Sequence, residues 1–160
     1  MKRIVFLITL AVLLPFFASC GAPSGQSSEV KDFTLESIDG KKVSLSDFKG
    51  KVVLLVFGFS RCPYCVREIS TLNKINEEYK GKDFKLVYIN LSEGMEYVKD
   101  FVKEAGIKYL TLVDVSGKTA MMYGIIGVPA NFLINKSQTK IWIVDIYDNI
   151  EEKIDALLQE

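Results

Sequence analysis

Histidine is absent from this 160-residue sequence, and cysteine occurs only three times. A structural zinc site takes about four Cys or His ligands, so the sequence lacks the residues for one. Cys20 lies in an apolar N-terminal leader, which leaves Cys62 and Cys65 as a pair. An inert disulfide across so short a loop would constrain the unfolded chain only weakly. We therefore interpret the pair as redox-active rather than structural or metal-binding.

An excess of charge of either sign is also absent. The sequence has 20 basic and 20 acidic residues and a formal net charge of zero. Proteins that bind nucleic acid usually carry a basic surface, and nothing in this composition points to one. We therefore expect no nucleic-acid partner. The length predicts a leader followed by one domain with a sizeable core.

The N-terminal apolar stretch is too short for a comfortable membrane span. It covers residues 4–18, after Lys2 and Arg3, whereas a span needs about 20 residues. The pattern predicts a signal peptide over residues 1–19. Residues 17–20 (FASC) resemble a bacterial lipoprotein box, with Phe where Leu is usual, and this resemblance implies lipidation of Cys20. An ordinary secretory leader and an uncleaved anchor are the alternatives.

Behind the leader, the sequence divides into a tether and a folded domain. Residues 20–31 include a short Ser/Gly-rich stretch, which predicts a flexible tether. The folded domain is then expected over residues 32–160. No internal repeat divides that domain further.

A predicted strand-to-helix junction carries both cysteines of the pair. The unbroken apolar run 52–57 predicts a strand buried on both faces. Apolar residues then recur every three or four positions, which predicts an amphipathic helix. These residues are Val66, Ile69, Leu72, Ile75 and Tyr79. Cys62 and Cys65 therefore lie at the N-terminus of that helix.

This location favours thiol chemistry. Unpaired backbone N–H groups and the helix dipole stabilise a thiolate at a helix N-terminus and can lower a thiol pKa from about 8.5 to roughly 3.5–7.5. Cys62 is expected at the exposed helix tip, and Cys65 about one turn deeper, within bonding distance. We predict that Cys62 attacks a partner's disulfide and that Cys65 resolves the mixed disulfide. Pro63 suits the first turn, where no backbone N–H is needed.

The rest of the domain alternates between strand and helix patterns. A turn at residues 38–41 predicts an N-terminal hairpin. The other predicted elements are a short turn or helix at 44–50, strands at 85–91, 109–113, 131–135 and 140–146, and helices at 93–105, 118–123 and 150–158. This order predicts an α/β fold, a mixed sheet with helices on both faces.

Two distant segments together carry a resemblance to a known fold. The motif Cys62-Pro63-Tyr64-Cys65 after a buried strand, with YGIIGVP at residues 123–129, resembles thioredoxin-fold proteins. The leader, the hairpin and a helix-plus-strand insertion at about residues 92–117 are similar to membrane-tethered thiol-disulfide oxidoreductases of the TlpA/ResA kind. The likeness covers about residues 33–158, nearly the whole domain.

The resemblance implies roles for residues outside the cysteine pair. It implies that Pro129 is cis and faces the cysteines, and that the main chain of Val128 pairs with an extended substrate. With these two, Pro63 and Tyr64 complete the expected substrate-binding set. Ala130 stands where the fold's proteins often have Thr, so one hydrogen bond near the site is expected to be missing. The Pro-Tyr dipeptide suggests a potential less reducing than that of thioredoxin.

Two charged residues near the pair leave alternatives open. Glu68 lies about one turn beyond Cys65 and matches an acidic residue that helps proton movement in the ResA-like subgroup. A nearby carboxylate would raise a thiol pKa and could accept its proton; the alternative is a solvated surface charge. Arg61 could stabilise the Cys62 thiolate, although an exposed loop arginine is the favoured interpretation.

The sequence therefore predicts an extracytoplasmic thiol-disulfide oxidoreductase with no metal and no cofactor beyond a redox-active Cys62–Cys65 disulfide. The resemblance implies a reductase of protein clients, such as those of cytochrome c maturation, and we expect the chain to be a monomer. A membrane thiol-disulfide electron donor would restore the dithiol. Lipidated Cys20 would anchor the chain to the cell membrane or the outer membrane, on the periplasmic face. The alternatives are an oxidase of secreted proteins, a peroxiredoxin-type peroxidase, a Sco-like copper protein and a binding module with an inactive pair.

Overall fold

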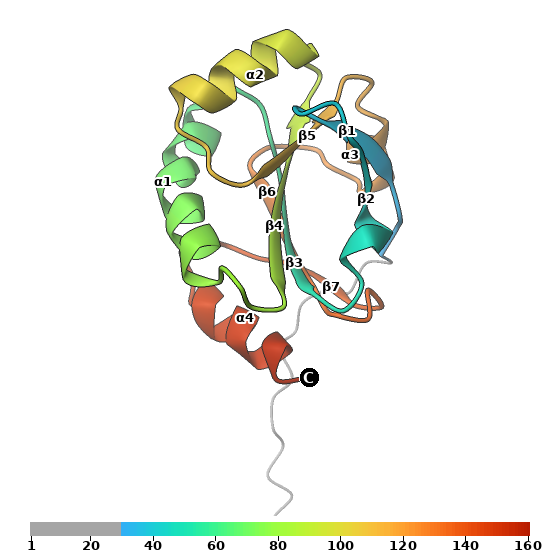
Figure 1. The fold of residues 1–160 in the computed structure, drawn as a ribbon, viewed down its shortest axis with the longest axis vertical. Coiled ribbons are helices and arrows are strands. Elements are labelled where there is room, and N and C mark those ends of the chain that lie inside the picture. Colours follow the sequence, from blue (N-terminus) through green and yellow to red (C-terminus); the bar gives the residue numbers. More distant parts are fainter. Residues whose placement is uncertain (1–29) are drawn as a thin grey trace, which may run out of the picture.

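The computed structural model describes residues 30–160. The predicted leader, Cys20 and the tether up to residue 29 lie outside the described residues. Figure 1 shows one sheet with helices on both sides. Its elements are β1 (Thr34–Ser37), β2 (Lys42–Ser44), the 3-10 turn η1 (Leu45–Phe48), β3 (Val52–Gly58), α1 (Pro63–Glu78), β4 (Phe84–Leu91), α2 (Met95–Glu104), β5 (Leu110–Asp114), α3 (Lys118–Met122), β6 (Ala130–Ile134), β7 (Ile141–Ile143) and α4 (Ile150–Leu158).

The seven strands form a mixed sheet in the order β2-β1-β5-β4-β3-β6-β7. Strands β3, β4 and β5 are parallel to one another, and each strand outside them runs antiparallel to its neighbour. The predicted fold class is therefore confirmed, including the N-terminal hairpin β1–β2. The predicted insertion is α2 with β5, and β5 lies between β4 and the hairpin.

Strand β3 is the centre of the packing, because all seven of its residues are buried. Its side chains alternate between two cores. Val52, Leu54 and Val56 belong to the core under α1 and α4, whereas Val53, Leu55 and Phe57 belong to the core on the α3 side. Figure 1 shows α1, α2 and α4 on one side of the sheet and α3 on the other. Burial of each such side chain stabilises the fold by about 1.5–3 kcal/mol.

Two predicted boundaries are wrong for local reasons. The last strand was expected to reach residue 146 but ends at Ile143, because Asp145 accepts the backbone N–H of Tyr147 in a turn. The second helix was expected to begin at Glu93 but begins at Met95, with Gly94 as its N-cap. The side chain of Glu93 binds a different loop instead.

The sheet register brings three segments together at one end. Gly58, the last residue of β3, lies opposite Asn90 near the end of parallel β4. Strand β6 runs antiparallel to β3, so its first residue, Ala130, pairs with Phe57. The start of α1, the segment after β4 and the segment before β6 therefore meet at the upper end of the sheet in Figure 1.

Candidate active site

Cys62 and Cys65 form a disulfide at the N-terminus of α1. Their Cα atoms are 5.2 Å apart, within the usual range for a disulfide. Cys62 is the N-cap, and its sulfur accepts the backbone N–H of Cys65 at 3.2 Å. Pro63 is the first helical residue, as predicted. The helix N-terminus is therefore directed at the sulfur of Cys62, the predicted nucleophile.

The expectation that Cys62 is exposed at the helix tip is wrong. Cys62 is only 5% exposed and Cys65 is 1% exposed. The carbonyl oxygen of Val128 lies 3.7 Å from the Cys62 sulfur and helps to cover it. Sequence periodicity could not show this cover, because Val128 is 66 residues away along the chain.

The peptide bond between Val128 and Pro129 is cis, as the resemblance implied. The pairing of β6 with β3 places this bond beside the disulfide. The segment before it carries Ile126, whose side chain is fully exposed. The structure thus brings Cys62, Cys65, Val128 and Pro129 together, and it leaves apolar surface next to them.

A hollow of about 320 Å³ lies beside the disulfide. Its lining residues are Tyr64, Arg67, Glu68, Pro129 and Tyr147. The Arg67 guanidinium stacks on the ring of Tyr64, 4.3 Å from the ring centroid, and both tyrosine side chains are exposed. The predicted substrate-binding residues Tyr64 and Pro129 therefore share one surface.

Glu68 is buried, so the interpretation as a solvated surface charge is wrong. Glu68 is only 6% exposed, because its side chain lies between α1 and β6. The side-chain amide of Asn131 donates to its two carboxylate oxygens at 3.2 and 3.4 Å. Burial raises the pKa of Glu68 from 4.5 to about 7, with a further increase from the charge of Asp145, while the Asn131 hydrogen bond acts in the opposite direction. This carboxyl group can therefore gain or lose a proton near neutral pH.

A second buried carboxylate, Glu93, was not expected from the sequence. Its oxygens accept the Ser60 backbone N–H at 3.0 Å and the Ser60 hydroxyl at 2.6 Å. The exposed side chain of Arg61 adds an ion pair, with Nε 3.8 Å from the carboxylate. Glu93 thus ties the loop before Cys62 to the end of β4. No local pattern marks this role, because Ser60 and Glu93 are 33 residues apart.

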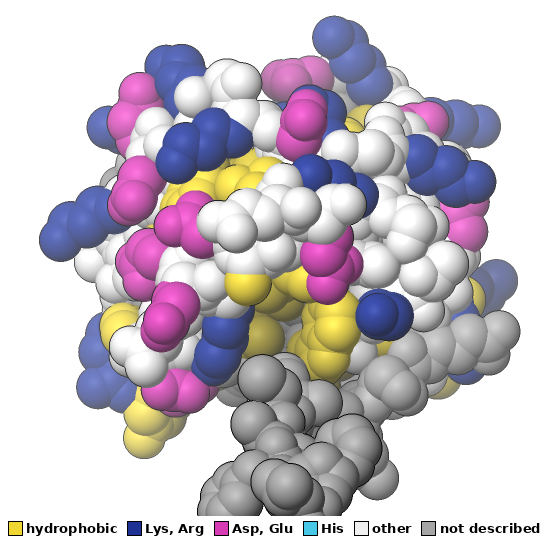
Figure 2. Space-filling view, turned by 90° about the horizontal axis from the view of Figure 1, so that it is seen from below, with side chains coloured by type: hydrophobic (Ala, Val, Ile, Leu, Met, Phe, Trp, Pro, Cys, Tyr) yellow, Lys and Arg dark blue, Asp and Glu magenta, His cyan; other side chains and the backbone are white. Residues whose placement is uncertain are grey.

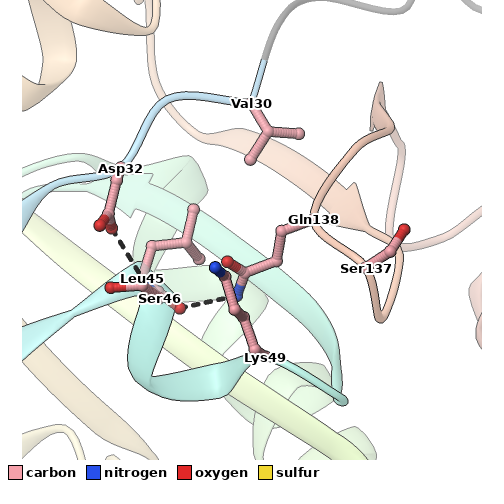
Figure 3. A pocket seen from close by; sticks show the side chains of 7 residues that line it. All are labelled: Val30, Asp32, Leu45, Ser46, Lys49, Ser137 and Gln138. Carbon is pink, nitrogen blue, oxygen red and sulfur yellow. Dashed lines mark hydrogen bonds between the residues drawn. The ribbon is translucent and has the colours of Figure 1, made fainter.

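Another hollow lies at the opposite end of the domain (Figure 3). Its walls include Asp32, Ser46 and Gln138, and they come from the start of the described chain, η1 and the turn before β7. Asp32 accepts the backbone N–H of Ser46, and Gln138 donates to the carbonyl of Leu45. These groups hold one another in place, and the lining contains no thiol. We therefore place the candidate active site at the disulfide.

Figure 2 views the domain from that opposite end. On this face, Lys and Arg side chains are interspersed with Asp and Glu side chains. Within residues 30–160, no three His, Cys, Asp or Glu side chains gather in a way that could hold a metal ion. Nor does any helix in this part of the chain have the length and apolar character to cross a membrane.

The disulfide, the neighbouring cis-proline and the mixed sheet are the features of a thioredoxin-like thiol-disulfide oxidoreductase, and comparison with known proteins supports this class. Residues 25–158 match the Redoxin family, and the chain belongs to that family. It is 32% identical over 139 residues to the thiol-disulfide oxidoreductase ResA of Bacillus cereus. The aligned region covers 84% of this chain and 80% of the relative. The ResA protein of Bacillus anthracis is 30% identical over 132 residues, covering 82% and 76% of the two chains.

Solved structures agree with this assignment. The thioredoxin domain of a thiol-disulfide oxidoreductase from Bacteroides vulgatus superposes with a TM-score of 0.71 at 25% sequence identity. The superposition covers 79% of this chain and 96% of that domain. The predicted resemblance to TlpA/ResA-like oxidoreductases is therefore confirmed.

Proposed function

We propose that this chain reduces disulfides of protein clients outside the cytoplasm, with Cys62 as the nucleophile and Cys65 as the resolving thiol. The observation that carries the proposal is the position of the Cys62 sulfur at the N-terminus of α1, 3.7 Å from the Val128 carbonyl. A helix N-terminus stabilises the attacking thiolate. An extended client segment that pairs with the Val128 main chain would bring its own disulfide to that sulfur.

The reaction transfers two electrons from the dithiol to the client. The Cys62 thiolate attacks one client sulfur, the client S–S bond breaks, and the other client sulfur leaves as a thiolate and takes a proton. Cys65 then attacks the Cys62 sulfur and releases the first client sulfur, so the Cys62–Cys65 disulfide forms. A membrane thiol-disulfide electron donor would restore the dithiol by the reverse exchange.

Glu68 fits the role of proton acceptor for Cys65 in this scheme. A pKa of about 7 allows the carboxylate to accept a proton at neutral pH and to return it later. Its place on α1, three residues beyond Cys65 along the helix, puts it near the resolving thiol. Tyr64, Pro63 and Pro129 would contact the client around the sulfur.

The reduction potential of the Cys62–Cys65 pair tests the direction of the reaction. We expect a value nearer to about −270 mV, typical of thioredoxin, than to about −120 mV, typical of the oxidant DsbA. Equilibration with glutathione or dithiothreitol buffers, followed by thiol counting, measures it. A value near that of DsbA would favour oxidation of secreted proteins and reject the reductase.

Mixed-disulfide trapping tests the residue roles and the clients. Cys65→Ser should leave clients bound to Cys62, because the resolving step is missing. Cys62→Ser is the matched control and should trap far less. Equal trapping by the two variants would contradict the assignment of the nucleophile. Recovery of apocytochrome c would support a role in cytochrome c maturation, whereas recovery of unrelated secreted proteins alone would reject it.

The proposed location rests on Cys20, for which we propose lipidation and attachment to the outer side of a bacterial membrane. Cell fractionation of the full chain tests this. We expect the wild-type chain in the membrane fraction and the Cys20→Ser variant outside it. Equal amounts of both in the membrane fraction would contradict lipid anchoring through this residue. We further propose that the chain acts as a monomer, which its sedimentation would show.

A further inference from the structure

The last residue of β3 is a glycine for a reason that the structure makes visible. A Cβ atom added at Gly58 would lie 2.4 Å from the hydroxyl oxygen of Tyr88, far closer than real contacts allow. The same point lies 3.2 Å from the sulfur of Cys65. The Tyr88 hydroxyl and the Cys65 sulfur are therefore neighbours above Gly58, and any larger residue would displace one of them.

The Tyr88 hydroxyl has no protein partner in the described part of the chain. Tyr88 is 1% exposed, and its ring packs near the ring of Tyr109, with centroids 6.1 Å apart. No hydrogen bond among residues 30–160 includes this hydroxyl, and its oxygen is not fully enclosed, unlike that of Tyr109. A nearly buried donor without a protein partner among residues 30–160 thus lies beside the sulfur that loses its bond whenever the disulfide opens.

The hydroxyl remains a donor across the pH range in which thiol exchange proceeds. Burial raises the pKa of Tyr88 well above its usual value, and the carboxylates of Glu93 and Glu68 act in the same direction. Hydrogen bonds to an ionised acceptor are shorter and stronger than those to a neutral one. A hydrogen bond from this neutral hydroxyl should therefore become stronger when the sulfur becomes negative.

We propose that the Tyr88 hydroxyl is a catalytic hydrogen-bond donor to the Cys65 sulfur, where it stabilises the negative charge that develops as the Cys62–Cys65 bond opens. This inference rests on the proposed function. When an incoming thiolate attacks Cys62, a new S–S bond forms to Cys62 and the electron pair of the broken bond passes to Cys65. The hydroxyl then binds that thiolate until the thiolate takes a proton. The reverse step uses the same contact.

The role of the hydroxyl separates from that of Glu68. Tyr88 donates a hydrogen bond and keeps its proton, whereas Glu68 exchanges one. A better-stabilised leaving thiolate leaves faster, so the contact should act on the rate with which external thiols open the disulfide. The ring of Tyr88 has a separate packing role, which Phe would preserve.

The test compares Tyr88→Phe with Tyr109→Phe in the full chain, with Cys20→Ser in all proteins so that Cys62 and Cys65 are the remaining cysteines. Tyr109 is the matched control, because its ring lies beside that of Tyr88 and its hydroxyl is buried without a partner among residues 30–160. We expect dithiothreitol to reduce the Tyr88→Phe disulfide about fivefold to tenfold more slowly than wild type. Tyr109→Phe should keep the wild-type rate. An equal slowing in both variants would assign the effect to packing and overturn the proposal.

Gly58→Ala probes the same contact from the other side. The added methyl group should push the hydroxyl away from the sulfur and slow reduction to a similar degree. In the Tyr88→Phe background the same change should slow the reaction little further, because the donor is already gone. Additive effects of the two changes would contradict a shared contact.

A second measurement detects a role that packing alone could not play. With Cys62→Ser present, the pH dependence of Cys65 alkylation reports the pKa of that thiol. We expect Tyr88→Phe to raise this pKa, and an unchanged value would overturn the proposal. The wild-type protein separates the two levels of inference. If it does not reduce client disulfides, the proposed function fails, whereas an active wild type matched by Tyr88→Phe would reject only the role of Tyr88.

Discussion

Two buried carboxylates flank the disulfide, and their surroundings differ. Glu93 accepts two hydrogen bonds from Ser60 and forms an ion pair with Arg61. Both partner residues belong to the loop before Cys62. Glu68 receives hydrogen bonds only from the amide of Asn131 within the described chain, and burial raises its pKa to about 7. Both residues are glutamates, and both are less than a tenth exposed.

The difference teaches that donors, rather than burial alone, decide what a buried carboxylate can do. A carboxylate that receives backbone and hydroxyl donors compensates for its lost hydration and fixes the groups that donate. A carboxylate with one weakly placed amide compensates poorly, so its protonated form becomes competitive. We therefore regard Glu93 as a structural link of the loop and Glu68 as a group that can carry protons.

The largest expected effect is on stability when the structural link is removed. Glu93→Ala leaves the Ser60 N–H and hydroxyl without their acceptor, and we expect a loss of about 3 kcal/mol in the free energy of unfolding. Urea denaturation measures the loss. Glu96→Ala is the matched control, because the side chain of Glu96 is exposed and pairs only with Lys99 in the described chain; it should change stability by less than about 0.5 kcal/mol. If Glu93→Ala also lowered the free energy of unfolding by less than about 0.5 kcal/mol, Glu93 would not be the structural link that distinguishes it from Glu68.

The second effect follows from the raised pKa of Glu68. The folded state binds the Glu68 proton more tightly than the unfolded state does. The contribution of protonated Glu68 to stability is therefore fully present below about pH 4.5 and is lost as the pH rises to about 7. Glu68→Gln cannot ionise and should avoid this decline. We expect the variant to be more stable than wild type by roughly 2–3 kcal/mol at pH 8 and by much less at pH 4.5.

Urea denaturation at several pH values gives the full curve. A stability difference that stays constant with pH would contradict the raised pKa. The same variant should slow client reduction at pH 7 by about tenfold to a hundredfold, because Cys65 loses a proton acceptor. Retention of the wild-type rate by Glu68→Gln would remove Glu68 from the proposed mechanism while leaving the disulfide chemistry intact.

A smaller effect is expected when the partner of Glu68 is removed. Asn131→Ala deletes the amide donor, at a cost of about 1 kcal/mol in stability. Because the Asn131 hydrogen bond lowers the pKa of Glu68, its loss should move the pH range of declining stability upward. The same denaturation series measures this shift. A downward shift would show that Asn131 does not act as a donor to the carboxylate.

The smallest effect concerns Arg61. Its side chain is 79% exposed and its Nε lies 3.8 Å from Glu93, so the ion pair is open to water and salt. We expect Arg61→Ala to change the free energy of unfolding by less than about 0.5 kcal/mol, and by even less in high salt. A loss close to that of Glu93→Ala would mean that the ion pair, rather than Ser60, accounts for the link.

Local patterns in the sequence determined the elements and the chemistry of the cysteine pair. The apolar run 52–57 and the spacing of Val66, Ile69, Leu72 and Ile75 predicted β3 and α1, because strand and helix periodicity depend on near neighbours. The spacing of Cys62 and Cys65 predicted a bond within one helical turn. The cis bond at Pro129 came from the family resemblance, and the structure confirms it.

Only the tertiary structure decided how the side chains around the disulfide behave. Glu68 meets Asn131 across 63 positions of the chain, Glu93 meets Ser60 across 33, and Cys62 is covered by a carbonyl 66 residues away. A pKa, a buried donor or a covered sulfur depends on which groups exclude water within a few ångströms. That arrangement is fixed by the pairing of distant strands, which no spacing along a single segment encodes.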